Sequence, residues 1–231
     1  GIMRAKEKLY KHLPRPKLNR TKINEIYQRL QNLDPAPRTE LNYTNVFTLV
    51  VAVALSAQST DIGVNKATKR LFELADTPQK MMKLGENTIR DHIKTIGLYK
   101  TKARNVVALS KMLIKEFNSN VPSTREDLIK LPGVGRKTAN VVLNDYFGQP
   151  TMAVDTHIFR VSNRTGMAPG KDPVEVELNL LRVTGQKYIN HAHHWLILLG
   201  RYTCIARKPK CYNCPVNDLC SYKSKTLKPE S

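Results

Sequence analysis

Apolar residues recur at helical spacing along most of the chain. Ile23, Ile26, Tyr27 and Leu30 form one such stripe, and the segment 34–37, which contains two prolines, ends it. Between 44 and 57 nearly every position is apolar, which predicts a helix buried at the centre of a domain. Further amphipathic segments predict helices over 63–75, 103–117, 125–131, 136–147, 155–164, 173–183 and 190–200. Because alternating apolar and polar positions are scarce, we predict an all-α fold.

Two segments that lie 36 residues apart resemble each other. Each reads as a helix, a short glycine turn and a second helix. Residues Asp91, Ile93, Lys94, Gly97, Ala103 and Val106 match Asp127, Ile129, Lys130, Gly133, Ala139 and Val142. The identities are compatible with duplication and with convergent helix-hairpin chemistry. Either origin predicts two helical hairpins in tandem.

The second hairpin has the features of a phosphate clamp. Gly133 and Gly135 permit positive φ angles and close approach of the backbone to a ligand. The helix that begins near Arg136 leaves its first amide hydrogens unpaired at the positive end of its dipole. An anion fits there, and a DNA phosphate agrees with the charge of the chain. An ordinary structural turn is the alternative.

The first hairpin lacks the second glycine and presents Leu98 at its tip. A leucine in this position either packs against the protein or, near DNA, acts as a wedge that unstacks a base pair.

Lys137 and Asp155 carry the candidate chemistry. A lysine attacks carbon only as a neutral amine, and an ordinary lysine is almost fully protonated at neutral pH. The helix start and Arg136 favour the neutral form, whereas Asp155 favours the cation. Asp155 is therefore better suited to accept a proton or to stabilise positive charge in a sugar. The structural alternatives are a phosphate-binding lysine and an aspartate that caps a helix.

Net charge and composition point to a polyanionic partner. The formal charge of +19 over 231 residues is extreme, and residues 1–20 carry seven Lys or Arg against one acidic residue. We interpret 1–21 as a basic, flexible arm. The longest apolar stretch is too short to cross a membrane, and the N-terminus lacks the apolar core of a secretory signal. We therefore expect a cytoplasmic protein that is not bound to a membrane. We also expect a monomer that associates with the bacterial nucleoid.

All four cysteines lie close together, at Cys204, Cys211, Cys214 and Cys220. Four crowded thiols in an intracellular protein favour a metal site over disulfides. Only one Cys-x2-Cys pair is present, so the spacing leaves both zinc and an iron–sulfur cluster open. The basic loop 205–210 lies between the first two thiols, and a metal centre would hold it out toward phosphate.

Taken together, these motifs resemble endonuclease III, a family of bifunctional DNA glycosylases and apurinic/apyrimidinic lyases in the helix-hairpin-helix superfamily. The resemblance runs from about Lys22 to Tyr222. It rests on the cysteine spacing and on the segments LSAQSTD, LPGVGRKTANVVLN, AVDTHIFRV and HHWLILLGRYTCIARKPKC. Leu199 departs from the family, where a histidine is common, and the N-terminal arm is unusually long.

The resemblance implies roles for individual residues. Lys137 matches the lysine that forms a Schiff base, and Asp155 matches the catalytic aspartate. Gln58 matches the glutamine that fills the gap left by an extruded nucleotide, and Leu98 the opposing wedge. The four cysteines match the ligands of a [4Fe-4S] cluster. The further expected DNA contacts are Gly133, Gly135, Arg136, His157, Arg207, Lys208 and Lys210.

The family's fold implies two helical domains that flank a DNA-binding cleft. Residues 39–149 would form a six-helix barrel domain with the helix-hairpin-helix, and 22–38 plus 150–231 the cluster domain. The implied activity is removal of oxidised pyrimidines from damaged double-stranded DNA, followed by strand cleavage through β-elimination. Two alternatives stay open. One is an adenine-mismatch glycosylase of the same superfamily, although those relatives generally lack the lysine and carry a further C-terminal domain. The other is a non-catalytic DNA-binding module.

Overall fold

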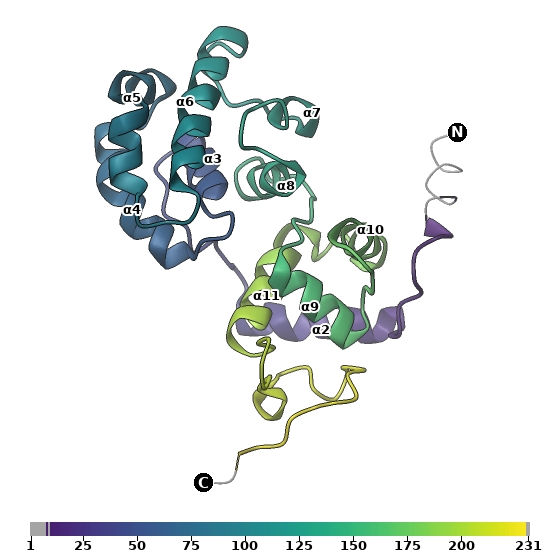
Figure 1. The fold of residues 1–231 in the computed structure, drawn as a ribbon. Coiled ribbons are helices and arrows are strands. Elements are labelled where there is room, and N and C mark those ends of the chain that lie inside the picture. The colour runs from purple at the N-terminus through teal and green to yellow at the C-terminus, as the bar shows by residue number, and fades with distance from the viewer. Residues whose placement is uncertain (1–7, 9, 230–231) are drawn as a thin grey trace. The chain divides into compact units, whose positions relative to one another are not determined.

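The computed structural model of the protein describes residues 8 and 10–229. Within them the chain forms ten α-helices, one short 3-10 helix and no strand, which confirms the predicted all-α fold (Figure 1). None of the described helices is long and apolar enough to cross a membrane. The described residues separate into two compact units, one made of 39–149 and the other of the segments before and after it.

The unit 39–149 is built around one buried helix, α3 (Val46–Leu55). Eight of its ten residues are buried, as the run of apolar residues predicts. Asn45 and Thr48 form a reciprocal capping box that fixes where this helix begins. The other helices of the unit are α4 (Asp61–Leu74), α5 (Pro78–Ile93), α6 (Tyr99–Glu116), α7 (Arg125–Leu128) and α8 (Arg136–Asp145).

Only the end of helix α5 was predicted from the sequence, as the first helix of the hairpin that contains Asp91 and Ile93. Gly85 lies inside it with φ 81° and ψ 164°, so two helical segments meet at a kink. Met81 is buried before the kink, and Ile89 and Ile93 are buried after it. A glycine at positive φ interrupts the regular helical backbone at this point.

The other unit contains α2 (Arg20–Leu33), α9 (Thr156–Thr165), α10 (Pro173–Val183), α11 (Ile189–Tyr202) and the 3-10 helix η1 (Cys211–Asn213). Tyr27 of α2 lies at the centre of its core, stacked on Tyr188 with ring centroids 5.5 Å apart. Burial raises the pKa of Tyr27, and its hydroxyl forms a hydrogen bond with Thr184 at 2.8 Å. The indole of Trp195 donates to the carbonyl of Asp34 at the end of α2. These contacts join the N-terminal helix to the C-terminal third of the chain.

The described part of the basic arm makes specific contacts, whereas we predicted a flexible segment over 1–21. The backbone N–H of Lys17 donates to Gly166 at 2.7 Å, and Asn179 donates to the carbonyl of Pro14 at 3.0 Å. Leu18 is buried in the core of the unit, and α2 begins at Arg20 rather than Lys22. The partners in these contacts lie far along the chain, where a local sequence pattern does not reveal them. The prediction for residues 1–7 and 9 lies outside the described residues.

Candidate functional site

The hairpin between α7 and α8 has the geometry of a phosphate clamp. A turn closes when the N–H of Val134 donates to the carbonyl of Leu131 at 3.0 Å. Leu131 and Val134 are buried and anchor the turn, while Gly133 and Gly135 are exposed. No side chain caps the start of α8 at Gly135. The positive end of the helix dipole therefore faces a surface where an anion can bind.

The two glycines of this hairpin meet different structural demands. Gly133 has φ 79°, and a Cβ at this position would lie 3.1 Å from the Cβ of Asn105. Gly135 has an ordinary φ of −94°, and a Cβ there would meet open space. Gly133 is thus required by the fold of the turn, whereas Gly135 leaves the backbone accessible to a ligand.

Arg136 and Lys137 occupy the first turn of α8, and both side chains are exposed. An accessible amine therefore stands beside an uncapped helix start.

Gln58 and Leu98 lie on two loops of the same unit that contact each other. Both residues are exposed and both have φ 56°, in the left-handed region. A Cβ built on Gly97 would lie 3.6 Å from the carbonyl oxygen of Gln58, which shows how closely the loops approach. The fold brings these two predicted residues together, although 40 positions separate them in the sequence.

Asp155 is the N-cap of α9, in the other unit. One carboxylate oxygen accepts a hydrogen bond from the N–H of Ile158 at 2.8 Å. Capping is therefore one established role of this side chain, and it orients the carboxylate. His157, in the first turn of the same helix, lies 3.2 Å from the guanidinium of Arg160 through Nδ1.

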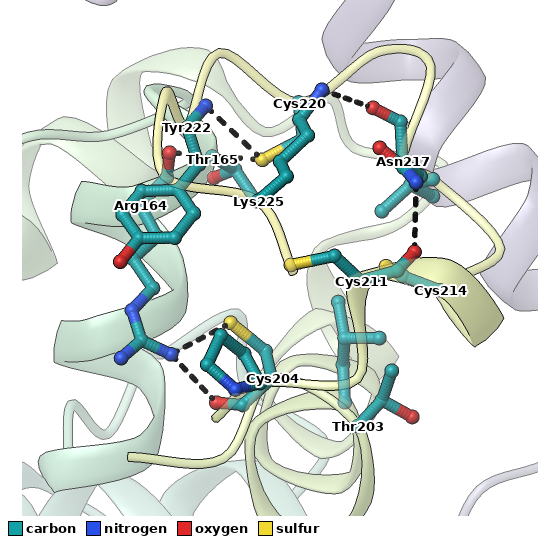
Figure 2. A pocket seen from close by; sticks show the side chains of 13 residues that line it. Arg164, Thr165, Thr203, Cys204, Cys211, Cys214, Asn217, Cys220, Tyr222 and Lys225 are labelled. Atoms are coloured by element: carbon teal, nitrogen blue, oxygen red, sulfur yellow. Dashed lines mark hydrogen bonds between the residues drawn. The ribbon is translucent and has the colours of Figure 1, made fainter. Parts of the chain in front are cut away.

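The four cysteines line a single pocket (Figure 2). All four are free thiols and partly buried. Other residues of the wall include Arg164, Leu199, Val216 and Tyr222.

This pocket suits a cluster held by thiolates. The backbone N–H of Tyr222 points at the sulfur of Cys220 at 3.4 Å, and the guanidinium of Arg164 lies 3.5 Å from the sulfur of Cys204. Such donors stabilise negative charge on sulfur. Burial raises the pKa of the Cys214 and Cys220 thiols, so thiolates here need a cationic centre to compensate. A cluster of iron and sulfide with four thiolate ligands supplies that compensation.

The basic loop 205–210 projects from the wall of this pocket. Arg207, Lys208 and Lys210 are exposed, and Lys208 has φ 50°. Arg164 holds the base of the loop by donating to the carbonyls of Ile205 at 2.7 Å and Ala206 at 2.8 Å. Three positive charges therefore stand together on a surface that is anchored beside the cysteines.

The sequence did not identify Arg164. It is one basic residue among many on an amphipathic helix, and nothing in the local pattern distinguishes it. Its position one residue before Thr165, where α9 ends, becomes informative only once the helix is placed beside the cysteine segment. Tyr222 then lies against its guanidinium, with the ring centroid 5.3 Å away.

Comparisons with known proteins agree with the helix-hairpin-helix and with the cysteine pocket described above. Residues 51–186 match the HhH-GPD superfamily base excision DNA repair proteins, and residues 204–220 match the iron–sulfur binding domain of endonuclease III. The latter span begins and ends at the first and last cysteines of the pocket.

Individual relatives match along most of their length. The chain is 56% identical to endonuclease III of Rickettsia felis over 200 residues, covering 87% of this chain and 94% of that protein. It is 54% identical to endonuclease III of Escherichia coli over 208 residues, covering 90% and 99%.

Among solved structures, a trapped endonuclease III–DNA covalent intermediate matches with a TM-score of 0.83 at 44% identity, covering 88% of this chain and 96% of that one. A non-covalent endonuclease III–DNA complex matches with the same values. The chain therefore belongs to the endonuclease III family of base excision DNA repair proteins, and it carries that family's iron–sulfur binding domain.

Proposed function

We propose that the protein is a base-excision-repair DNA glycosylase that removes oxidised pyrimidines from duplex DNA and then cleaves the strand as an apurinic/apyrimidinic lyase. The observation that carries this proposal is the exposed Lys137 amine beside the uncapped start of α8. A similar protein forms a trapped covalent intermediate with DNA, which supports a nucleophile in this family. Lys137 is the residue to test because its amine is exposed in the first turn of α8.

Binding begins at the phosphate backbone. The backbone amides that follow Gly133 bind phosphates of the damaged strand, and Arg136 adds its charge to this contact. Arg207, Lys208 and Lys210 contact phosphates elsewhere on the duplex, and His157 adds a further polar contact. Such contacts position the DNA but do not read its sequence.

The damaged nucleotide then leaves the base stack. Extrusion costs a few kcal/mol and costs least for a damaged pair, which contributes to selectivity. Gln58 fills the gap in the duplex, and Leu98 enters from the opposing side. Both residues are exposed on adjoining loops, as insertion into DNA requires.

Chemistry at the sugar proceeds in two stages. The Nζ of Lys137 attacks C1′, the bond from C1′ to the base breaks, and the base leaves with the bonding electrons. Asp155 accepts the proton that the amine releases, and the first product is an aminal. The C1′–O4′ bond of the aminal then breaks, O4′ takes up a proton, and a protonated imine is left between Lys137 and the opened sugar. The imine makes the 2′ proton acidic, so its removal expels the 3′ phosphate and cleaves the strand.

The four cysteines hold the iron–sulfur cluster in this proposal. The cluster neutralises their thiolates and fixes the segment 204–220, which in turn positions the basic loop. No chemical step at the sugar needs the cluster.

Borohydride trapping tests the proposal. Wild-type protein incubated with a thymine-glycol duplex and borohydride should form a covalent protein–DNA adduct, while Lys137→Ala should form none. Arg136→Ala, the matched change at the neighbouring position, should weaken binding but still trap at saturating protein. Trapping by Lys137→Ala at the wild-type level would contradict the proposed nucleophile. Binding without base release by the wild type would show a non-catalytic module, and adenine release from a mismatch would indicate the alternative glycosylase.

A further inference from the structure

The amine of Lys102 is buried inside the unit 39–149. This residue lies in the first turn of α6, and only 8% of it is exposed. Its Nζ donates to the carbonyl of Ala57 at 2.6 Å and to the hydroxyl of Ser59 at 3.0 Å. Burial lowers the pKa of this amine, so keeping it here costs free energy. A buried amine with such a cost calls for a specific role.

Both acceptors flank Gln58. Ala57 precedes it and Ser59 follows it, so the ammonium group bridges the two sides of a single residue. Gln58 itself has φ 56°, a conformation that non-glycine residues seldom adopt. Such a conformation persists only where the surroundings enforce it. Lys102 supplies that enforcement from outside the loop.

The backbone of Lys102 is tied to the second loop. Its N–H donates to the carbonyl of Leu98 at 2.9 Å, in the first turn of α6. Leu98 also has φ 56°, stands at the N-cap of this helix and is 59% exposed. Lys102 therefore contacts both loops, through its side chain on one and its backbone on the other.

We propose that Lys102 is a positioning residue for DNA interrogation, holding Gln58 and Leu98 at a fixed separation so that they enter the duplex together. The inference rests on the proposed function, which assigns the gap-filling role to Gln58 and the wedge to Leu98. Lys102 acts through these residues and touches no DNA, because its amine is buried and bonded within the protein. Without the ammonium group, Gln58 relaxes toward ordinary backbone angles and the pair loses its spacing.

Lys102→Met tests the proposal because methionine fills similar space without the charge or the donors. The probe is a duplex that carries a tetrahydrofuran abasic analogue opposite 2-aminopurine, which fluoresces when it is unstacked. Wild-type protein should bind this duplex more tightly than an intact one and raise its fluorescence. Lys102→Met should reduce the binding preference by roughly tenfold, as expected for a lost hydrogen bond from a charged group, and should reduce the fluorescence gain.

Lys111→Met serves as the control, because Lys111 is exposed on the same helix. It should keep the wild-type preference and fluorescence. The salt dependence of binding separates positioning from direct contact. Lys102→Met should keep the wild-type slope of log affinity against log salt, whereas loss of a phosphate contact would reduce it by about one unit.

Two results with Lys102→Met would overturn the inference. One is a wild-type preference and fluorescence gain, and the other is a salt slope that falls by about one unit. If Lys102→Met does not fold, Ser59→Ala provides the test, since it removes one of the two acceptors and keeps the charge. It should lower the preference by about two- to threefold, and no change would overturn the inference. A wild type without any preference for the abasic duplex would instead overturn the proposed function, and the inference with it.

Discussion

The guanidinium of Arg164 donates to the carbonyl of Ile205 at 2.7 Å, and this bond joins α9 to the segment that carries the cysteines. A second bond reaches Ala206, and Tyr222 lies over the same group. The basic loop therefore depends on a residue that lies 41 positions before Ile205.

Arg164→Met should destabilise the cluster segment. The change leaves two carbonyls without their charged donor, which costs about 2 kcal/mol. Thermal unfolding followed at the visible absorbance of the cluster measures the loss. Lys171→Met, which changes an exposed lysine of the same unit, is the control and should leave the transition unchanged. An unchanged transition for Arg164→Met would show that the loop needs no such anchor.

Two substitutions at Asp155 should separate capping from chemistry. Asparagine caps helices about as well as aspartate, so Asp155→Asn should keep the stability while base release slows by at least about a hundredfold. Asp155→Ala should lose base release and also about 1 kcal/mol of stability. Urea unfolding and single-turnover base release measure the two effects. Full activity in Asp155→Asn would leave the residue with a capping role alone.

The glycines of the clamp should respond differently to alanine. Gly133→Ala places a Cβ at φ 79° against Asn105 and should cost about 1–2 kcal/mol of stability. Gly135→Ala meets open space at an ordinary φ, so stability should hold while affinity for duplex DNA falls. Thermal unfolding measures the stability of each variant, and a titration of the same samples with duplex DNA measures the affinity. The reverse pattern would show that the phosphate binds elsewhere.

Salt titration should identify the residues that contact phosphate. Arg207→Ala and Lys208→Ala should each flatten the slope of log affinity against log salt by about one unit. Both side chains are exposed on the basic loop, where a phosphate can reach them. Lys69→Ala removes an exposed charge from α4 and serves as the comparison. Equal slopes for all three variants would mean that the loop makes no specific phosphate contact and contributes only to the overall electrostatic field of the protein.

Much of the fold and of the candidate chemistry follows from local sequence. The apolar run around Val50 requires a buried helix, and the stripe through Ile23 and Tyr27 requires an amphipathic one. Four crowded cysteines restrict the chemistry to metal or disulfide, and a proline with two glycines before a helix predicts a tight turn. Local spacing is sufficient in these cases because each signal lies within a few residues. The roles of Lys137 and Asp155 came from family resemblance and stay predictions.

Other features depended on contacts between distant residues. Most of helix α5 was not predicted, since the repeat indicated only its end near Asp91, and the backbone is interrupted at Gly85. Residues 10–19 were interpreted as part of a flexible arm. Their hydrogen-bond partners, such as Asn179 and Gly166, lie far along the chain and give no local signal.

The sequence by itself determined an all-α, strongly basic chain with a glycine hairpin and a thiol cluster, because periodicity, charge and spacing are local properties. Tertiary structure alone decided which residues support those features. In the sequence, Lys102 and Arg164 are not distinguished from other basic residues. The structure shows that Lys102 binds the Gln58 loop and that Arg164 binds the cysteine segment. These hydrogen bonds join residues that lie far apart in the sequence, so their partners can be identified only from the folded structure.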